Sequence, residues 1–328
     1  MVVQQPVVPS REDKVLRMGS RAAARRQPGL SRSGRVRLTS RRLEMIAGLL
    51  FVAPVVLHLL IFKYFPVLYS IRLSMFRGTL LNPFRTYFGI ANYEHVFTNA
   101  YAIRGFTNTF VYALIYVPAA VVIGMVLGLI VAKPHFGRTF FRAAYYTPVV
   151  VSVVAAVQVW AWILSPERYG IMNTLFSAVG LPQLGWLRHP NTALISLAIM
   201  GLWNSGLNML IYLAALNGIS PELYECARVD GASRRRQFWS ITLPLLMPTT
   251  YFVVITSTIL ALKLFEPVLL LTGGGPLNST TTVAYQIYEQ AFQFSRWGRA
   301  SAQATIFFFL VLFITVIQYK YLPESYEK

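Results

Sequence analysis

Long uncharged apolar runs constrain the fold of this chain more than any other feature of its sequence. Each run has about 18 residues or more, the length that crosses a hydrocarbon core of roughly 30 Å as a helix rising 1.5 Å per residue. Backbone groups in lipid must be paired within the protein, which leaves helices or a closed barrel, and the runs lack the two-residue alternation of a barrel. The sequence therefore predicts an all-α, polytopic membrane protein with six transmembrane helices. The runs cover residues 45–62, 106–132, 143–164, 192–221, 237–262 and 300–319.

The predicted transmembrane domain covers residues 44–322, between a basic tail (1–43) that we expect to be disordered and a short C-terminus (323–328). A further uncharged stretch, 267–288, contains TGGGP and a threonine-rich segment. Glycine and proline in such a cluster favour a turn, so we expect the outer end of span five and a loop here. The six predicted spans are 45–65, 106–132, 141–164, 192–217, 243–271 and 301–321.

The distribution of charge predicts the orientation. The chain has a net charge of +18, and residues 1–43 hold eleven Lys and Arg against Glu12 and Asp13. Basic segments stay on the cytoplasmic side, so we expect the tail, the 133–142 and 218–241 loops, and the C-terminus to be cytoplasmic. The tail lacks the interleaved aromatic residues that stack on bases. We therefore expect it to contact anionic lipid and not nucleic acid.

The sequence has no catalytic or metal-binding constellation. It holds one cysteine, Cys226, and four scattered histidines, and the phosphate-binding pattern GxxxxGK[ST] is absent. We expect no cofactor or metal on this chain, and no enzyme activity of its own. A membrane enzyme would need ionisable groups at the centres of the spans, which are uncharged. An ion-coupled secondary transporter would need them too, and only His58, Lys263 and Glu266 come close.

The loop between spans four and five, residues 218–244, is predicted to form a helix, a turn and a second helix. Ser220 suits an N-cap, Pro221 the first helical position, and Glu222 the positive end of the helix dipole. Gly231 offers the left-handed residue that ends a helix. A short amphipathic helix of this kind, exposed at the membrane surface, is typical of an element that docks into a partner's groove.

The same loop resembles the EAA loop of ABC importer permeases. The resemblance rests on Glu225-Cys226-Ala227, three residues, Gly231, nine residues, and then Ile241-Thr242-Leu243-Pro244, with cysteine where the pattern usually has alanine. In that family the loop is a coupling helix seated in a cleft of the ATPase subunit. The resemblance implies that Glu225 pairs with a basic group there and that Gly231 makes the turn. The implied docking residues are Glu225, Cys226, Ala227, Asp230, Gly231, Ala232, Leu243 and Pro244.

Residues 45–320 resemble carbohydrate permeases of the maltose/glycerol-3-phosphate type, in particular the first of their two unlike transmembrane subunits. The matching landmarks include Asn92-Tyr93, Asn108-Thr109, Arg142, Pro148 and the TGGGP sequence at 272–276. The resemblance implies a prokaryotic cytoplasmic membrane protein that imports a sugar by alternating access. Its partners would be a second permease, two ATPase subunits that bind ATP and Mg, and an outer solute-binding protein. A phosphorylated polyol is the alternative solute, which a basic outer cavity would favour.

Candidate solute-contacting residues lie near the predicted midpoints of spans four and five. Asn204 and Asn208 are helical neighbours beside Trp203, and an indole with two amides suits a sugar. Mid-membrane amides face protein or a water-filled cavity, so they could equally join helices. Thr256 and Ser257 could line the same cavity or bond their own helix. At the outer boundary we expect an ion pair between Lys263 and Glu266, and Trp160 and Trp162 in an interfacial belt.

Overall fold

The computed structural model describes residues 34–321 apart from 80, 134–135 and 168. For residues 34–42 it describes the backbone only. Residues 1–33 of the predicted basic tail and the whole predicted C-terminus, 323–328, lie outside the described residues. The chain divides into two compact units, residues 1–65 and 66–328.

The first unit contains α2 (Gly34–Leu59) and a π-helical turn, η1 (Leu60–Tyr64), and the helix continues into the second unit as α3 (Phe65–Leu73). The candidate membrane span in this helix runs over Leu43–Leu73, longer than the predicted 45–65, and its most apolar window has no buried residue. Apolar side chains such as that of Phe51, which is 86% exposed, therefore need lipid or another chain to cover them.

The core of the second unit forms where α5 (Ala100–Ala132) packs against α10 (Gly206–Asn217) and α13 (Leu243–Leu262). Small residues on α5 allow close approach of the helices. A Cβ added at Gly124 would lie 2.6 Å from the Cβ of Asn208, and one at Gly128 would lie 2.9 Å from that of Tyr212. Tyr212 of α10, fully buried, packs there with Val121 of α5 and with Leu246 and Val253 of α13.

Two predicted spans are broken. Residues 141–164 form α6 (Arg138–Val150) and α7 (Val153–Ile163), which meet at 103°, so a single straight span is the wrong description of this segment. Pro148 removes a helical donor just before Val151 and Ser152 turn extended. Residues 192–217 form α9 (Pro190–Leu202) and α10, which meet at 47°. The described chain therefore has four long apolar helices, or up to six spans if each bent pair counts as one.

Span five begins and ends earlier than predicted. Its helix runs from Arg234 to Leu262 through α12 (Arg234–Gln237), η3 (Phe238–Thr242) and α13, and not from 243 to 271. Lys263 caps the helix, so Lys263 and Glu266 do not share a helical turn. Both side chains are exposed, and no ion pair between described residues joins them, so that prediction was wrong.

The segment after span five turns back on itself, as the glycines suggested. It contains η4 (Val268–Thr272), positive φ at Gly273 and Gly274, a cis bond between Gly275 and Pro276, and then the short helices α14 (Val283–Tyr288) and η5 (Glu289–Gln293). The last span is α15 (Trp297–Lys320), close to the predicted 301–321.

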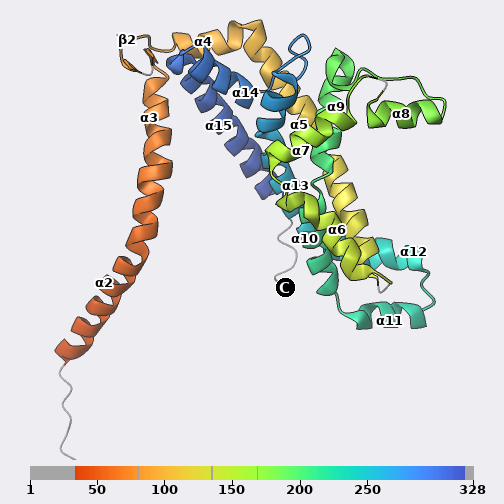
Figure 1. The fold of residues 1–328 in the computed structure, drawn as a ribbon. Helices are drawn as coiled ribbons and strands as arrows, with labels where there is room; N and C mark the ends of the chain where they lie inside the picture. Colours follow the sequence, from red (N-terminus) through yellow and green to blue (C-terminus); the bar gives the residue numbers. More distant parts are fainter. Residues whose placement is uncertain (1–33, 80, 134–135, 168, 322–328) are drawn as a thin grey trace, which may run out of the picture. The chain divides into compact units, whose positions relative to one another are not determined.

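Short elements lie at the two ends of the second unit (Figure 1). One end carries a hairpin of β1 (Phe76–Arg77) and β2 (Thr86–Tyr87), followed by α4 (Ala91–Thr98). The other end carries α11 (Pro221–Val229) and α12. Between α7 and α9 lie α8 (Ile171–Ala178) and η2 (Trp186–Arg188). The long helices thus separate the hairpin end from the α11 end.

Candidate functional site

The helix α11 is a mostly surface-exposed element with well-defined ends. Ser220 Oγ accepts a hydrogen bond from the Glu222 amide at 3.3 Å, and the helix contains no buried residue. After Asp230 the chain turns through Gly231 at φ +75°, and the Ala232 amide donates to Ala227 O at 2.8 Å. A residue with a side chain would be strained at that φ. The predicted cap and turn are therefore both present in the structure.

Two hydrogen bonds attach α11 and its turn to the helix that enters the membrane region. The hydroxyls of Tyr224 and Thr242 lie 2.9 Å apart, and Gln237 Nε2 donates to Ala232 O at 2.9 Å. Thr242 is buried in η3, directly before the long apolar helix α13. A displacement of α11 would therefore be transmitted to the base of this span.

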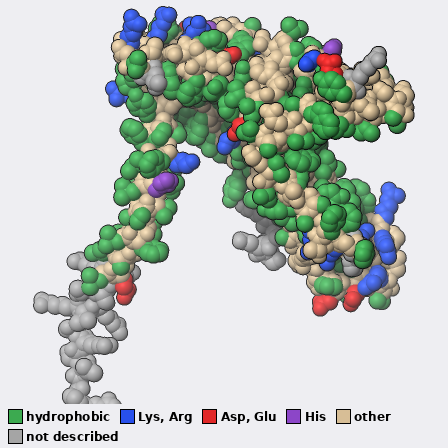
Figure 2. Space-filling view, viewed as in Figure 1, with side chains coloured by type: hydrophobic (Ala, Val, Ile, Leu, Met, Phe, Trp, Pro, Cys, Tyr) green, Lys and Arg blue, Asp and Glu red, His purple; other side chains and the backbone are tan. Residues whose placement is uncertain are grey.

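The exposed side chains of this loop form a mixed-charge surface. Glu225 lies 3.5 Å from Arg228, with about two-thirds of each side chain exposed. A surface ion pair of this kind contributes little, about 0–1 kcal/mol, so Glu225 remains available to another partner. Cys226, Asp230 and Gly231 are also exposed, whereas Ala227, Ala232, Leu243 and Pro244 are half-buried. Figure 2 shows acidic and basic side chains gathered at this end.

The predicted mid-span polar residues separate into different environments. Asn208 on α10 donates from Nδ2 to Ser257 Oγ on α13 at 3.4 Å, and both residues are buried. Asn204 lies exposed in the break before α10, so it does not share a helical face with Asn208. Thr256 donates to Phe252 O of its own helix at 2.8 Å. The amide of Asn208 thus joins two helices.

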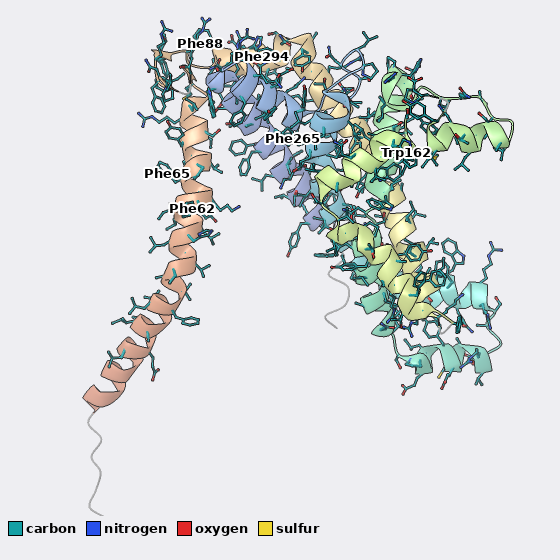
Figure 3. All side chains as sticks on the ribbon, viewed as in Figure 1. Phe62, Phe65, Phe88, Trp162, Phe265 and Phe294 are labelled. Carbon is teal, nitrogen blue, oxygen red and sulfur yellow. The ribbon has the colours of Figure 1, made fainter. Side chains whose placement is uncertain are left out.

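Trp203 lies at the same helix break and is 41% exposed. Its ring packs edge-on against Trp160 of α7, with the ring centroids 6.1 Å apart. Trp160 therefore belongs to an internal aromatic pair, which the sequence did not indicate. Trp162, labelled in Figure 3, is 56% exposed and stays compatible with an interfacial belt. The bend between α6 and α7 accounts for the contact, because it turns α7 towards α9.

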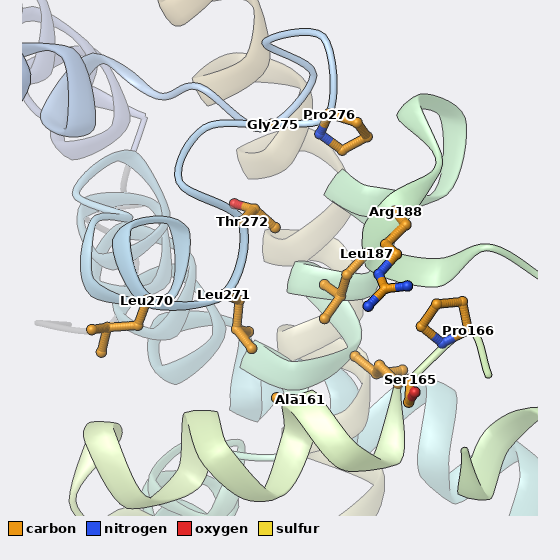
Figure 4. Close-up of a pocket in the computed structure, with 11 residues that line it drawn as sticks. Ala161, Ser165, Pro166, Leu187, Arg188, Leu270, Leu271, Thr272, Gly275 and Pro276 are labelled. Atoms are coloured by element: carbon orange, nitrogen blue, oxygen red, sulfur yellow. The ribbon is translucent and has the colours of Figure 1, made fainter. Parts of the chain in front are cut away.

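A cavity of about 430 Å³ lies at the end of α7 (Figure 4). Its walls come from the end of α7, from Arg188 in η2, and from the turn at Thr272 and Pro276. Leu271 lines the cavity and also packs against the cluster that contains Trp160. Sequence reasoning missed this cavity, although the TGGGP turn that forms one wall was visible in the sequence.

Buried hydrogen bonds fix the TGGGP turn to the rest of the second unit. Asn108 of α5 donates from Nδ2 to Asn278 O at 2.8 Å and to Thr281 O at 2.9 Å. Thr282 Oγ1 donates to Leu264 O at 2.8 Å, and the Val283 amide donates to Thr109 Oγ1 at 3.0 Å. Buried hydrogen bonds of this kind favour one conformation of a loop. The turn is therefore a rigid wall of the cavity.

The described residues contain no group of three or more His, Cys, Asp or Glu side chains that could hold a metal ion. The geometry instead combines long apolar helices with an exposed helix that is hydrogen-bonded to the base of one of them. These features are those of a membrane-spanning subunit that docks on a partner at one face of the membrane, as in the resemblance noted for the 218–244 loop.

Residues 102–327 match the family described as the binding-protein-dependent transport system inner membrane component, and the chain belongs to this family. It is 31% identical to the probable ABC transporter permease protein YurN of Bacillus subtilis, over 85% of this chain and 97% of YurN. It is 32% identical to the lactose transport system permease protein LacF of Rhizobium radiobacter, over 86% of this chain and 95% of LacF.

Solved structures share the fold. A chain of a bacterial ABC transporter involved in the import of the acidic polysaccharide alginate superposes with a TM-score of 0.75 at 24% identity, over 89% of this chain and all of that one. A chain of the bacterial alginate ABC transporter in complex with its alginate pentasaccharide-bound periplasmic protein superposes with a TM-score of 0.73 at 25% identity, over 85% of this chain and 93% of that one. The predicted fold, an ABC importer permease, is therefore confirmed.

Proposed function

We propose that this subunit moves a sugar or sugar-like solute inward by alternating access, driven by ATP hydrolysis on separate subunits. The observation that carries the proposal is the exposed helix α11, capped at Ser220 and bonded through Tyr224 to the base of span five. Relatives named for the transport of lactose and of trehalose/maltose, at 32% and 31% identity, support a carbohydrate as the solute.

The docking proposal assigns roles to the residues of the loop. Glu225 pairs with a basic group of the ATPase subunit, Gly231 supplies the turn, and Ala227 and Ala232 allow close packing. Their partial or full exposure supports these roles, and so does the weak surface ion pair of Glu225, which leaves its carboxylate open to another partner. Leu243 and Pro244 begin the span that receives the movement, because they follow Thr242, the hydrogen-bond partner of Tyr224.

The full transporter would contain a second permease, two ATPase subunits that bind ATP and Mg, and an outer solute-binding protein. The exposed apolar surface of the Leu43–Leu73 span supports a second membrane subunit or lipid as its cover. With α11 facing the ATPases in the cytoplasm, both termini of this subunit are cytoplasmic and the hairpin end is outside. For the solute we propose Trp203 and Asn204 as contacts, since both are exposed at the helix break.

The docking proposal can be tested with Glu225→Ala and Gly231→Pro in the assembled transporter, measured as solute uptake and transport-linked ATPase activity. Both activities should fall about tenfold or more while membrane insertion stays normal. Glu225→Ala removes a charge-assisted contact that contributes about 1.5–3 kcal/mol, and Gly231→Pro breaks the turn because proline cannot adopt the positive φ of Gly231. Glu167→Gln is the matched control, since Glu167 is a half-exposed acid near the other end of the unit. Normal uptake by Gly231→Pro would contradict the docking role of this loop.

A further inference from the structure

A second cavity, of about 570 Å³, lies at the hairpin end of the second unit and is strongly basic. Arg77 ends β1 and Arg85 directly precedes β2, while Arg296 caps α15 and Arg299 lies in its first turn. All four arginines line the cavity. Figure 2 shows basic side chains gathered at this end, away from α11. Four positive charges thus converge from two segments that are more than two hundred residues apart.

These four arginines have no acidic partner among the described residues. Of the ion pairs found there, one joins Arg188 to Glu167 and the other joins Arg228 to Glu225. Glu289 lies in an adjoining cavity with Arg296 and Arg299, but its Oε2 accepts a hydrogen bond from the Tyr101 hydroxyl at 2.6 Å. The first turn of α15 contains no acidic residue either. The positive helix end therefore adds to the positive potential of the arginines.

Aromatic rings hold two of these guanidinium groups in place. Arg77 lies over the ring of Phe88 at 5.7 Å, and Arg296 lies over that of Phe294 at 5.2 Å. Both rings line the cavity and are labelled in Figure 3. Stacking of arginine on an aromatic face leaves its planar N–H groups free to bind an anion. The aromatic residues therefore orient the charges before a ligand arrives.

The cavity walls are fixed by buried contacts between the hairpin, α4 and α15. Asn92, which is 2% exposed, donates from Nδ2 to Ser74 O at 2.8 Å and to Phe76 O at 3.0 Å. A Cβ added at Gly298 would lie 1.9 Å from Phe76 O, so only glycine allows this approach. The arginines thus line a preformed, rigid cavity, and this preorganisation reduces the entropy lost when a ligand binds.

We propose that this arginine cavity binds the anionic group of a small acidic solute, a carboxylate, phosphate or sulfonate. The proposal rests on the proposed function, which places the hairpin end outside, where solute arrives. Guanidinium groups bind such oxyanions through paired N–H donors. A hollow of this size fits a small molecule. An acidic protein surface would instead bind to a flat basic patch. The substrate class of this importer is then an acidic saccharide or a similar polar anion.

The test uses the assembled transporter in nanodiscs of neutral lipid, with galacturonate as the probe, galactose as its neutral counterpart, and calorimetry as the readout. Galacturonate should bind more tightly than galactose, and the double variant R77Q/R299Q should weaken it about tenfold or more, as expected for two lost charge-assisted contacts. R104Q, which changes an exposed arginine of α5 that lines neither cavity, should bind normally. The variant R77K/R299K keeps the charge but loses the paired donors, and should give an intermediate affinity.

Equal binding of the two sugars, or unchanged binding by R77Q/R299Q, would overturn the proposal. Two protection results would also overturn it, measured as resistance of the four arginines to chemical modification. Protection by phosphatidylglycerol nanodiscs alone would assign the cavity to a lipid headgroup. Protection only by the docked solute-binding protein would assign it to a protein contact. The α11 variants should bind galacturonate normally. If the arginine variants bound galacturonate normally while the α11 variants still lost uptake, the cavity proposal would be wrong and the docking proposal would stand.

Discussion

At the scale of single residues, the same amide chemistry serves different purposes in this chain. Asn208 is buried and joined to Ser257, Asn108 is buried and holds the TGGGP turn, and Asn204 is exposed at a helix break. Burial decides the difference, because a buried amide must be paired within the protein. An exposed amide in a membrane-spanning segment is free to bind a ligand, so Asn204 and the neighbouring Trp203 are better solute candidates than Asn208.

This distinction predicts opposite results for two alanine variants. Asn208→Ala leaves Ser257 without its interhelical partner, so the free energy of unfolding should fall by about 1–3 kcal/mol, seen as a lower melting temperature of the complex. Trp203→Ala should change stability less, because the side chain is 41% exposed, while solute uptake falls and basal ATPase activity is kept. A stable Asn208→Ala variant without uptake would instead make Asn208 a solute contact.

His95 on α4 reports the electrostatics of the arginine cavity. Burial lowers its pKa below 6.5, and the positive charges of Arg299 and Arg296 lower it further. The folded protein thus favours neutral His95, and the contribution of this residue to stability is complete above about pH 6.5 and lost as the pH falls through the depressed pKa. His95 shares its cavity with Glu289, whose carboxylate would act in the opposite direction.

Arg299→Gln should therefore raise the pKa of His95 towards 6.5, without restoring it fully, because burial is the largest cause of the shift. An NMR titration of the labelled histidine ring measures this directly, with Arg188→Gln as the control that leaves the pKa unchanged. Binding of an anion in the arginine cavity should raise the same pKa, because it neutralises the neighbouring charges. A pKa that does not respond to Arg299→Gln would contradict this electrostatic coupling.

At the scale of elements, α11 is connected to span five by few contacts, of which the Tyr224–Thr242 hydrogen bond is the most direct. Tyr224→Phe removes only this bond. The hydrogen bond contributes about 0.5–1.5 kcal/mol. Its loss should therefore weaken the coupling between ATP hydrolysis and uptake by about threefold to tenfold. The number of solute molecules moved per ATP measures this effect. Tyr319→Phe, at a 72% exposed tyrosine of α15, is the matched control, and an equal loss in both variants would count against the role of Tyr224.

The sequence predicted α11 and its turn well because their signals are local. Ser220, Pro221 and Gly231 each act on the backbone within a few residues of themselves. The bend of 103° between α6 and α7 was missed, because hydropathy measures only whether a segment is apolar. The arginine cavity was missed for another reason, since Arg77 and Arg299 are brought together by the tertiary packing of the hairpin on α15. Charge alone could not show that packing.

At the scale of the whole molecule, the Leu43–Leu73 span is the element that the chain itself leaves uncovered. Leu50 is 67% exposed on this span, and Leu81 is 97% exposed in the hairpin loop. Both side chains are mostly exposed, but the two leucines should face different surroundings. Leu50 needs lipid or a second permease subunit, because an apolar stripe of this length is not stable in water. Leu81 lies outside the candidate spans, where water is the expected solvent.

Leu50→Arg and Leu81→Arg therefore form a matched pair that tests the surroundings of span one. An arginine costs about 2.5–3.5 kcal/mol at the centre of a span on insertion scales. Leu50 lies in the first third of Leu43–Leu73, where the cost is smaller, so Leu50→Arg should reduce the amount of assembled transporter several-fold. Leu81→Arg should assemble normally, because its side chain stays in water. Purification of the membrane complex through a tag on the second permease measures the assembled fraction. If both variants assembled equally, span one could not be an apolar surface covered by lipid or by a neighbouring subunit.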